Sequence, residues 1–208
     1  MKPTLLRIIV NPAAGHEEEV RQALLTRLNA YQSNGVQPVM LRWIRSSFDL
    51  EILVAVFDFT DVDDFLIDVI RTTEHVMSTI TTVMLDGFIF LGGFVMAENA
   101  RLNNTAHAGA TIEISVTPGK DKEVFAALYD LPEADDLHKA MLFKSYTHEH
   151  NDLVLQLSST HNELIENYIQ IFVRPIDGIE DTYTSFTYGW AMLMDFEAFN
   201  ELQAQFAP

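Results

Sequence analysis

The chain contains an internal repeat, because the segment that begins at Asp49 recurs 103 positions later, from Asp152. Aligning residues 49–85 with residues 152–188 without gaps gives only five identities. The spacing of apolar residues agrees better. In both copies it changes from period two, typical of a strand, to the i, i+3, i+4, i+7 spacing of a helix, and then returns to period two. The matched apolar residues are Leu50, Ile52, Val54, Val62, Phe65, Leu66 and Val69 in the first copy, and Leu153, Leu155, Leu157, Ile165, Tyr168, Ile169 and Phe172 in the second.

Generic alternation of strands and helices can imitate a repeat, but two unrelated segments rarely change period at the same place. The match also extends outward when small gaps are allowed. Residues 8–20 and residues 114–124 each predict a strand, a Pro/Gly turn and a charged helix start, and residues 87–91 resemble residues 189–193. Each copy of a repeat is a supersecondary unit that packs against its neighbour. We therefore expect two units, residues 1–99 and residues 100–208.

Each unit is expected to run strand, helix, strand, strand, helix, strand, followed by an apolar tail. Thr60 and Thr160 are the predicted caps of the second helix in the two units. Right-handed strand–helix–strand crossovers place both helices on one face of a four-stranded antiparallel sheet, which is the ferredoxin-like arrangement. The other face must also be buried. The prediction is an α+β fold of two tandem ferredoxin-like βαββαβ units, with their sheets packed face to face as a pseudo-dimeric α/β barrel.

Composition excludes several classes of function. The net charge is −17, with 30 acidic and 13 basic residues, and such a field repels a phosphate backbone. We therefore expect no direct nucleic-acid binding. The chain has no cysteine, which excludes disulfides and thiolate metal sites. No apolar segment approaches the roughly 20 residues of a membrane helix, and the apolar N-terminal stretch is too short for a signal peptide. A soluble cytoplasmic protein is expected, with no membrane association.

Four motifs occur in order in the second copy. They are Val116-Thr117-Pro118-Gly119 before Glu123-Val124; Leu131-Pro132; Asn151-Asp152-Leu153; and Arg174-Pro175-Ile176-Asp177-Gly178-Ile179 followed by Thr182 and Thr184. With these motifs, residues 112–188 resemble the ligand-binding domain of the leucine-responsive regulator/AsnC family. The resemblance implies that a small effector such as an amino acid binds near the turn before Asp152. Two features depart from the family: its DNA-binding helix-turn-helix is missing, and so is the glycine usual in that turn.

The resemblance and the repeat together predict ligand-binding residues in the equivalent turns of the two units: Ser46, Ser47, Asp49, His148, His150 and Asp152. His148 and His150 could also hold a divalent metal together with Asp152 or His161, although a polar hairpin turn is the favoured interpretation. No catalytic residue, metal or cofactor is predicted.

Asp49 and Asp152, with Arg71 and Arg174, are charged residues that recur in both copies. They could bind the amino and carboxylate groups of a zwitterion, because arginine binds carboxylates through two hydrogen bonds. They could equally be a turn cap and a cation at a helix end.

We therefore expect a non-enzymatic protein that senses a small metabolite or has a regulatory role, with an amino acid as one candidate ligand between the units or at an oligomer interface. A homo-oligomer is expected. The alternative is a small enzyme of the dimeric α/β-barrel superfamily, monooxygenase-like or haem-handling, with a cavity between sheet and helices lined by residues such as Trp43, Tyr146 or a histidine. A purely structural assembly module is a third hypothesis.

Overall fold

The computed structural model describes residues 2–44, 47, 49–146 and 153–207. Within those residues the fold is α+β, with eight strands and six α-helices, and each strand pair whose register is known is antiparallel. Contacts divide the chain into two compact units. Unit 1 comprises residues 1–84 and 188–205, and unit 2 comprises residues 85–187 and 206–208. Among the helices described, none is long and apolar enough to cross a lipid bilayer.

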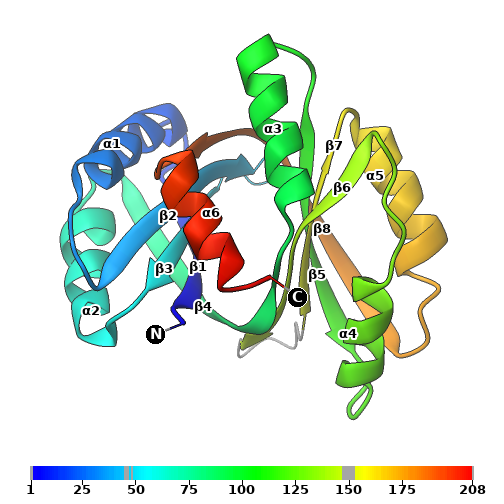
Figure 1. The fold of residues 1–208 in the computed structure, drawn as a ribbon. Helices are drawn as coiled ribbons and strands as arrows, with labels where there is room; N and C mark the ends of the chain where they lie inside the picture. The colour runs from blue at the N-terminus through cyan, green and yellow to red at the C-terminus, as the bar shows by residue number, and fades with distance from the viewer. Residues whose placement is uncertain (1, 45–46, 48, 147–152, 208) are drawn as a thin grey trace. The chain divides into compact units, whose positions relative to one another are not determined.

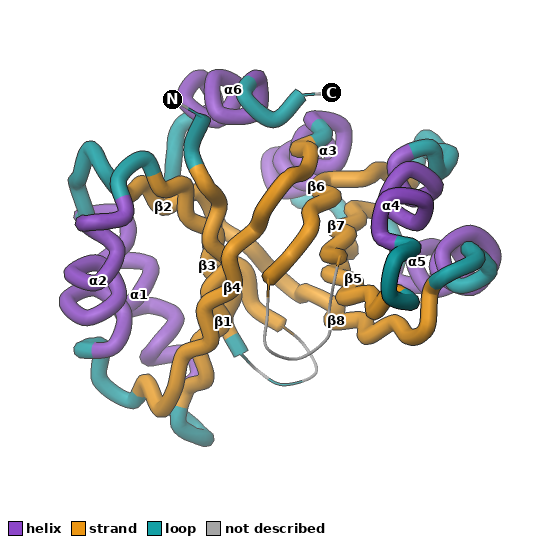
Figure 2. Tube along the Cα trace, turned by 90° about the horizontal axis from the view of Figure 1, so that it is seen from below, coloured by secondary structure: helices purple, strands orange, loops and turns teal. Residues whose placement is uncertain are grey.

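Unit 1 follows the predicted element order. Its elements are β1 (Thr4–Pro12), α1 (Glu17–Ala30), β2 (Val36–Ile44), β3 (Leu50–Val56), α2 (Val62–Asp64), a π-helical continuation of α2 (Phe65–Arg71) and β4 (Val76–Ile89) as far as Met84. Strand β1 pairs with both β3 and β4, and β3 pairs with β2, so the strand order is β4-β1-β3-β2. Helices α1 and α2 lie on one side of this sheet (Figure 2).

The predicted apolar stripe of α1 forms the core on that side. Glu17, Glu18 and Glu19 occupy the first turn of the helix, where negative charge is favourable. Val20, Leu24 and Leu28 are buried against aliphatic residues of β1 and β3. The sheet face covered by helices is thus filled with apolar side chains.

Unit 2 has the same order of elements, preceded by a helix. Its elements are α3 (Leu91–Asn103), β5 (Ala108–Val116), α4 (Asp121–Tyr129), β6 (Leu137–Tyr146), β7 (Leu153–Ser159), α5 (Asn162–Tyr168), a π-helical continuation of α5 (Ile169–Val173) and β8 (Ile179–Met192) as far as Thr187. Strand β5 pairs with β7 and β8, and β7 pairs with β6. Helices α4 and α5 cover one side of the sheet (Figure 1), over a second apolar cluster.

Fine details recur in both units. Arg71 Nε donates to Thr79 Oγ1 at 3.2 Å, and Arg174 Nε donates to Thr182 Oγ1 at 3.1 Å. The strand registers shift at matching places, after Asn11 in β1 and after Ser115 in β5. The recurring arginines thus hold the start of the last strand of each unit, which agrees with the structural interpretation of their charge.

The unit division falls inside strands β4 and β8, which differs from the expected boundary between residues 99 and 100. Each of these strands has 14 residues. Residues 85–89 of β4 lie with unit 2, where an ideal Cβ at Gly87 would be 2.3 Å from the carbonyl oxygen of Leu142. Residues 188–192 of β8 lie with unit 1, where the backbone N–H of Leu193 donates to the carbonyl of Val39 at 3.0 Å. Each unit therefore includes the end of a strand that begins in the other.

Two predicted helix caps are wrong. Thr60 is inside the helical turn, and Asp58 is the cap because its side chain accepts a hydrogen bond from the backbone N–H of Thr60. Helix α5 begins after His161, which makes no side-chain cap, so Thr160 is not the cap either. The apolar tails contain helices that were not predicted, α3 in unit 2 and α6 (Phe196–Ala204) in unit 1.

Candidate functional site

An aromatic and cationic cluster lies at the margin of the apolar core of unit 1. Trp43, near the end of β2, is partly buried against that core. The guanidinium carbon of Arg21, from α1, lies 4.8 Å from the centre of the Trp43 ring, and the ring of Tyr188, from the end of β8, meets the indole edge-on at 6.2 Å. We call Arg21, Trp43 and Tyr188 the indole cluster. It combines a flat apolar surface, a fixed cation and a phenol.

The backbone next to the indole cluster has no room for a side chain. An ideal Cβ at Gly189 would lie 1.9 Å from the Nε1 atom of Trp43. Glycine at this position lets the end of β8 approach the indole, and this approach places Tyr188 beside Trp43. The position of the phenol therefore depends on Gly189.

Charge around the indole cluster is set by Glu18. Its carboxylate accepts hydrogen bonds from Arg21, including one from Nε at 2.6 Å, and from Gln22. The hydrogen bonds from Arg21 lower the pKa of Glu18 to about 2. Burial raises the pKa of Tyr188, an effect that the positive charge of Arg21 partly opposes. At neutral pH the cluster therefore presents a guanidinium cation beside a protonated phenol, whose O–H is able to donate a hydrogen bond to a ligand.

Unit 2 has a different contact in the corresponding place. The ammonium of Lys144, on β6, lies 5.6 Å from the centre of the Phe125 ring, on α4. Here the strand carries the cation and the helix carries the ring, the reverse of unit 1. Unit 2 therefore provides a matched comparison for experiments on the indole cluster.

The side of the unit 1 sheet that faces away from α1 and α2 carries a buried ion triad. Glu51 accepts hydrogen bonds from Arg7 Nε at 3.1 Å and from Arg42. The three residues are 1%, 5% and 6% exposed, respectively. Burial alone would raise the pKa of Glu51, but the two guanidinium groups outweigh it and lower the pKa to about 2. In unit 2 the matching register positions hold Thr111, Phe143 and Val154.

The predicted ligand-binding residues are only partly within the described chain. Asp49 accepts a hydrogen bond from Asn11 Nδ2 at 2.7 Å, and its backbone N–H donates to Ser47 Oγ at 3.4 Å. The structure therefore brings Ser47 and Asp49 together in one turn, where the Asp49 carboxylate also binds the side-chain amide of Asn11. Ser46, His148, His150 and Asp152 lie outside the described residues, so the use of these turns for ligand binding stays a prediction.

A pocket of about 500 Å³ lies in unit 1, away from those turns. It is formed by the end of α1, the start of β2 and the residues before and within α6; its polar lining residues are Asn29, Gln32, Ser33, Asn34, Gln37 and Asp195. Ser33 Oγ donates to Asp61 at 2.7 Å, and the side chain of Asp195 caps α6 by accepting from Ala198 N–H. These contacts are those of turns and helix caps. The pocket has room for a small polar ligand, but its lining offers no activated nucleophile or base.

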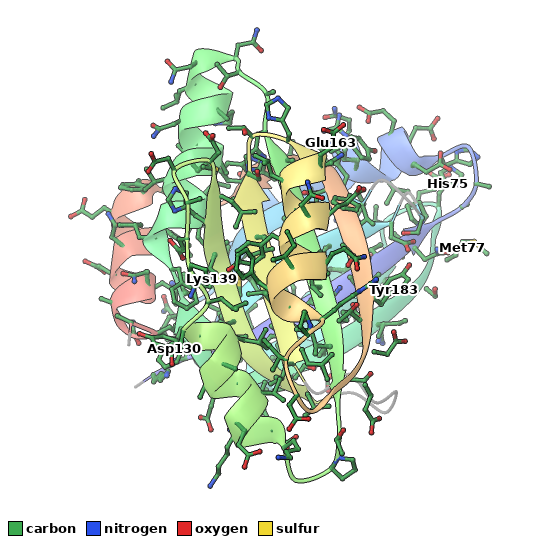
Figure 3. The ribbon with its side chains drawn as sticks, turned by 90° about the vertical axis from the view of Figure 1, so that its right-hand side faces the viewer. His75, Met77, Asp130, Lys139, Glu163 and Tyr183 are labelled. Atoms are coloured by element: carbon green, nitrogen blue, oxygen red, sulfur yellow. The ribbon has the colours of Figure 1, made fainter. Side chains whose placement is uncertain are left out.

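Sequence reasoning missed the buried lysine of unit 2. Lys139, on β6, is 4% exposed, and its ammonium donates to the backbone carbonyls of Tyr129 and Leu131 (Figure 3). It also lies 5.1 Å from the centre of the Phe90 ring. Burial lowers the pKa of Lys139. Because the ammonium binds carbonyls at the end of α4, we interpret Lys139 as a helix cap; a Lys in a largely apolar strand is the signal that could have identified it.

A haem does not fit between the sheet and the helices of either unit. That layer is filled in unit 1 by side chains such as Leu24, Ile52 and Phe65, which are at most 1% exposed. In unit 2 it is filled by Val124, Leu155 and similar residues. Among the expected cavity-lining residues, Trp43 lies at the margin of the layer, and the side chain of Tyr146 is outside the described part.

Comparison with solved structures identifies the architecture. A putative monooxygenase from Lactobacillus acidophilus NCFM has a TM-score of 0.57 at 6% identity, covering 93% of this chain and 97% of that one. An anthrone oxidase-like protein has a TM-score of 0.56 at 11% identity, covering 94% and 95%. A chlorite dismutase variant from Candidatus Nitrospira defluvii has a TM-score of 0.54 at 13% identity, covering 98% and 95%. The fold is that of the dimeric α/β-barrel proteins.

No protein-family model and no curated protein sequence matches the chain. The solved structures thus support the dimeric α/β-barrel fold, whereas the resemblance to the leucine-responsive regulator/AsnC family has no support beyond its motifs. The expectation of a non-enzymatic sensor is wrong, because the similar structures are named as monooxygenase, oxidase-like protein and chlorite dismutase. The motifs misled because they report turns and strand starts, and one fold supports many unrelated functions.

Proposed function

We propose that the chain is an enzyme that oxidises a flat aromatic substrate with molecular oxygen, bound at the indole cluster. One observation carries the proposal: the guanidinium of Arg21 and the phenol of Tyr188 both lie against the indole of Trp43. The ring of Tyr188 is 53% exposed and offers a surface on which an aromatic ring can stack. The likeness to an anthrone oxidase-like protein and to a putative monooxygenase supports this class of reaction.

The cluster suits a substrate whose reactive CH₂ group lies between aromatic rings and opposite a carbonyl, as in anthrones. Such a substrate loses a proton to water and becomes an anion with its charge on the carbonyl oxygen. Arg21 stabilises that charge, and Tyr188, which is protonated, donates a hydrogen bond to the same oxygen. Oxygen then adds to the carbon, and the resulting peroxide takes up a proton. The second C–H proton is lost to water as the O–O bond breaks and hydroxide leaves, and the hydroxide takes up a proton to become the one water released. The CH₂ group becomes a carbonyl and one O₂ is consumed.

The proposal includes the finer form of the fold. The repeated element order, the strand orders β4-β1-β3-β2 and β8-β5-β7-β6, and the recurring Arg–Thr pairs support two tandem ferredoxin-like units. In that arrangement the indole cluster belongs to one unit only, since Lys144 and Phe125 occupy the other.

The test uses anthrone as the probe. We expect enzyme-dependent oxygen uptake and formation of anthraquinone, measured with an oxygen electrode and by absorbance after subtraction of spontaneous oxidation. Arg21→Gln removes the cation opposite the developing charge, so kcat/KM should fall about a hundredfold. Tyr188→Phe removes one neutral donor, and a fall of about tenfold is expected.

The matched controls lie in unit 2. Lys144→Gln and Phe125→Leu disrupt the analogous cation–ring contact and should leave the rate unchanged. The proposal fails if oxygen uptake does not exceed that of the denatured protein, or if the unit 1 variants keep the wild-type rate.

Self-association also remains part of the proposal. Met77 and Ile80 on β4 and Tyr183 on β8 are 69%, 60% and 57% exposed. Large apolar side chains grouped on a strand commonly mark a protein interface. They support a homo-oligomer in which these strands contact another copy.

A further inference from the structure

Two histidines and a glutamate meet at one end of unit 1. His16 precedes α1, and Glu19 is in the first turn of that helix. His75, labelled in Figure 3, is in the turn before β4. The two imidazole rings are stacked, with their centres 3.7 Å apart. Glu19 Oε2 lies 2.9 Å from His16 Nδ1 and 3.7 Å from His75 Nε2. One ligand atom from each residue lies within 4.8 Å of the others.

We propose that His16, Glu19 and His75 form a binding site for a divalent transition-metal ion, with Zn²⁺ as the probe. Two imidazole nitrogens and one carboxylate oxygen are a donor set that zinc and its neighbours prefer. Ligand atoms around tetrahedral zinc are about 3.4 Å apart, given metal–ligand bonds near 2.1 Å. The two distances from Glu19, 2.9 and 3.7 Å, bracket this value. The imidazole rings, which are stacked face to face, must turn so that their nitrogen lone pairs converge on one ion. The partial exposure of all three residues leaves the remaining coordination position to water.

Unit 2 shows what occupies the same place without these histidines. The backbone frames match: Ala13 N–H donates to His75 O at 2.8 Å in unit 1, and Thr117 N–H donates to Gly178 O at 2.8 Å in unit 2. With the two backbones aligned in this way, Lys120 of unit 2 occupies the position of His16, and Glu123 occupies the position of Glu19.

The equivalent place in unit 2 already contains a cation, the ammonium group of Lys120. Lys120 Nζ lies 2.8 Å from Glu123 and 3.6 Å from Asp177. Unit 1 lacks a lysine at this position and has imidazoles around an equivalent carboxylate. A bound metal ion would supply in unit 1 the positive charge that the ammonium supplies in unit 2.

The backbone at His75 is unusual for a residue with a side chain. Its φ is +67°, and the residue in the matching place is Gly178, with φ +95°. Glycine adopts this conformation freely, whereas other residues do so rarely. The position therefore tolerates glycine without strain, which makes His75→Gly a variant that removes one ligand and preserves the fold.

Titration calorimetry with ZnCl₂ on the full chain tests the proposal. We expect one zinc ion to bind the wild-type protein at this site. His75→Gly should weaken that binding by at least about tenfold, and its melting temperature without zinc should be equal to or higher than that of the wild type. Glu19→Gln and His16→Lys should weaken zinc binding similarly, and His16→Lys recreates the ion pair of unit 2.

Two controls separate this site from others. Glu123→Gln alters the matching carboxylate of unit 2 and should leave zinc affinity unchanged. A His148→Ala/His150→Ala double variant tests the other histidine pair of the sequence and should retain the site. The proposal is overturned if the wild type binds no zinc, if His75→Gly binds with unchanged affinity, or if only the double variant loses binding.

Discussion

The carboxylate of Glu51 is held between two guanidinium groups on one face of the unit 1 sheet. The matching positions of unit 2 are Thr111, Phe143 and Val154, so the same pattern of strands forms there without the three charges. Removing one member of a buried ion triad is more costly than replacing all of it, because the remaining charges then lack compensation. Glu51 therefore stabilises unit 1 mainly by compensating the buried positive charges of Arg7 and Arg42.

Glu51→Gln should lower the free energy of unfolding by about 3–5 kcal/mol, measured by urea denaturation. A triple variant with the unit 2 residues, Arg7→Thr, Arg42→Phe and Glu51→Val, should lose less than half as much. An equal or larger loss in the triple variant would contradict this account.

The pH dependence of stability follows from the same carboxylate. The pKa of Glu51 in the folded protein is about 2, below its ordinary value of 4.5. A group with a lowered pKa contributes its full stabilisation above the unfolded value and loses it as the pH falls toward the folded value. Between about pH 4.5 and 2, the free energy of unfolding should therefore fall less in the triple variant than in the wild type. Urea denaturation at several pH values measures this difference.

Little of the residue-level chemistry of unit 1 was evident from the sequence. Arg7 interrupts an apolar strand, which signalled a charge in an unusual place, but its partner Glu51 is 44 positions away. Trp43 was recognised as a candidate, whereas Arg21 and Tyr188 were not. Their meeting depends on the course of β8, and side-chain contacts between segments so distant have no local signature.

At the scale of elements, the repeated spacing predicted strands and helices well because each pattern is local. The stripe Val20, Leu24 and Leu28 is buried as expected. The helices in the tails were harder to predict, because α3 begins with Leu91-Gly92-Gly93 and glycine is unfavourable in a helix. An ideal Cβ at Gly93 would be 2.7 Å from the Cβ of Ala140, so close packing on β6 outweighs helix propensity there.

The ends of β4 and β8 both contain a glycine that is pressed against a neighbouring strand of its unit. Gly87→Ala would place a Cβ within 2.3 Å of a backbone oxygen, and Gly189→Ala would place one within 1.9 Å of the indole of Trp43. Each substitution should cost about 1–3 kcal/mol of stability, as overpacking typically does. The exposed neighbour Asp86 provides the control, and Asp86→Ala should change stability by less than about 0.5 kcal/mol. Thermal and urea denaturation measure the stability of these variants. A Gly87→Ala variant as stable as the wild type would show that this strand end is not closely packed.

For the whole molecule, the unit division determines which fragments can fold. A fragment of residues 1–99 lacks residues 188–205 of unit 1, and a fragment of residues 100–208 lacks residues 85–99 of unit 2. The sequence predicted two units but not this exchange, because Gly87 and Gly189 follow shortly after positions 84 and 187 and resemble the starts of separate tails. In the structure both strands instead continue through these glycines.

We expect each fragment alone to be poorly folded and the two mixed fragments to regain cooperative unfolding. Circular dichroism and amide exchange of the separate and mixed fragments test this. The control is a full-length chain cleaved between Asn104 and His107, which should unfold like the intact protein. Independent, cooperative folding of both fragments would instead favour the boundary between residues 99 and 100.

The ion triad has a consequence for how such a chain can evolve. In an assembly of two identical subunits every substitution appears twice, so a charged group cannot be introduced on one side alone. In a single chain that restriction is absent: Arg7, Arg42 and Glu51 occur once, and the matching positions of unit 2 hold a threonine, a phenylalanine and a valine. One half is thereby free to specialise while its twin keeps the scaffold.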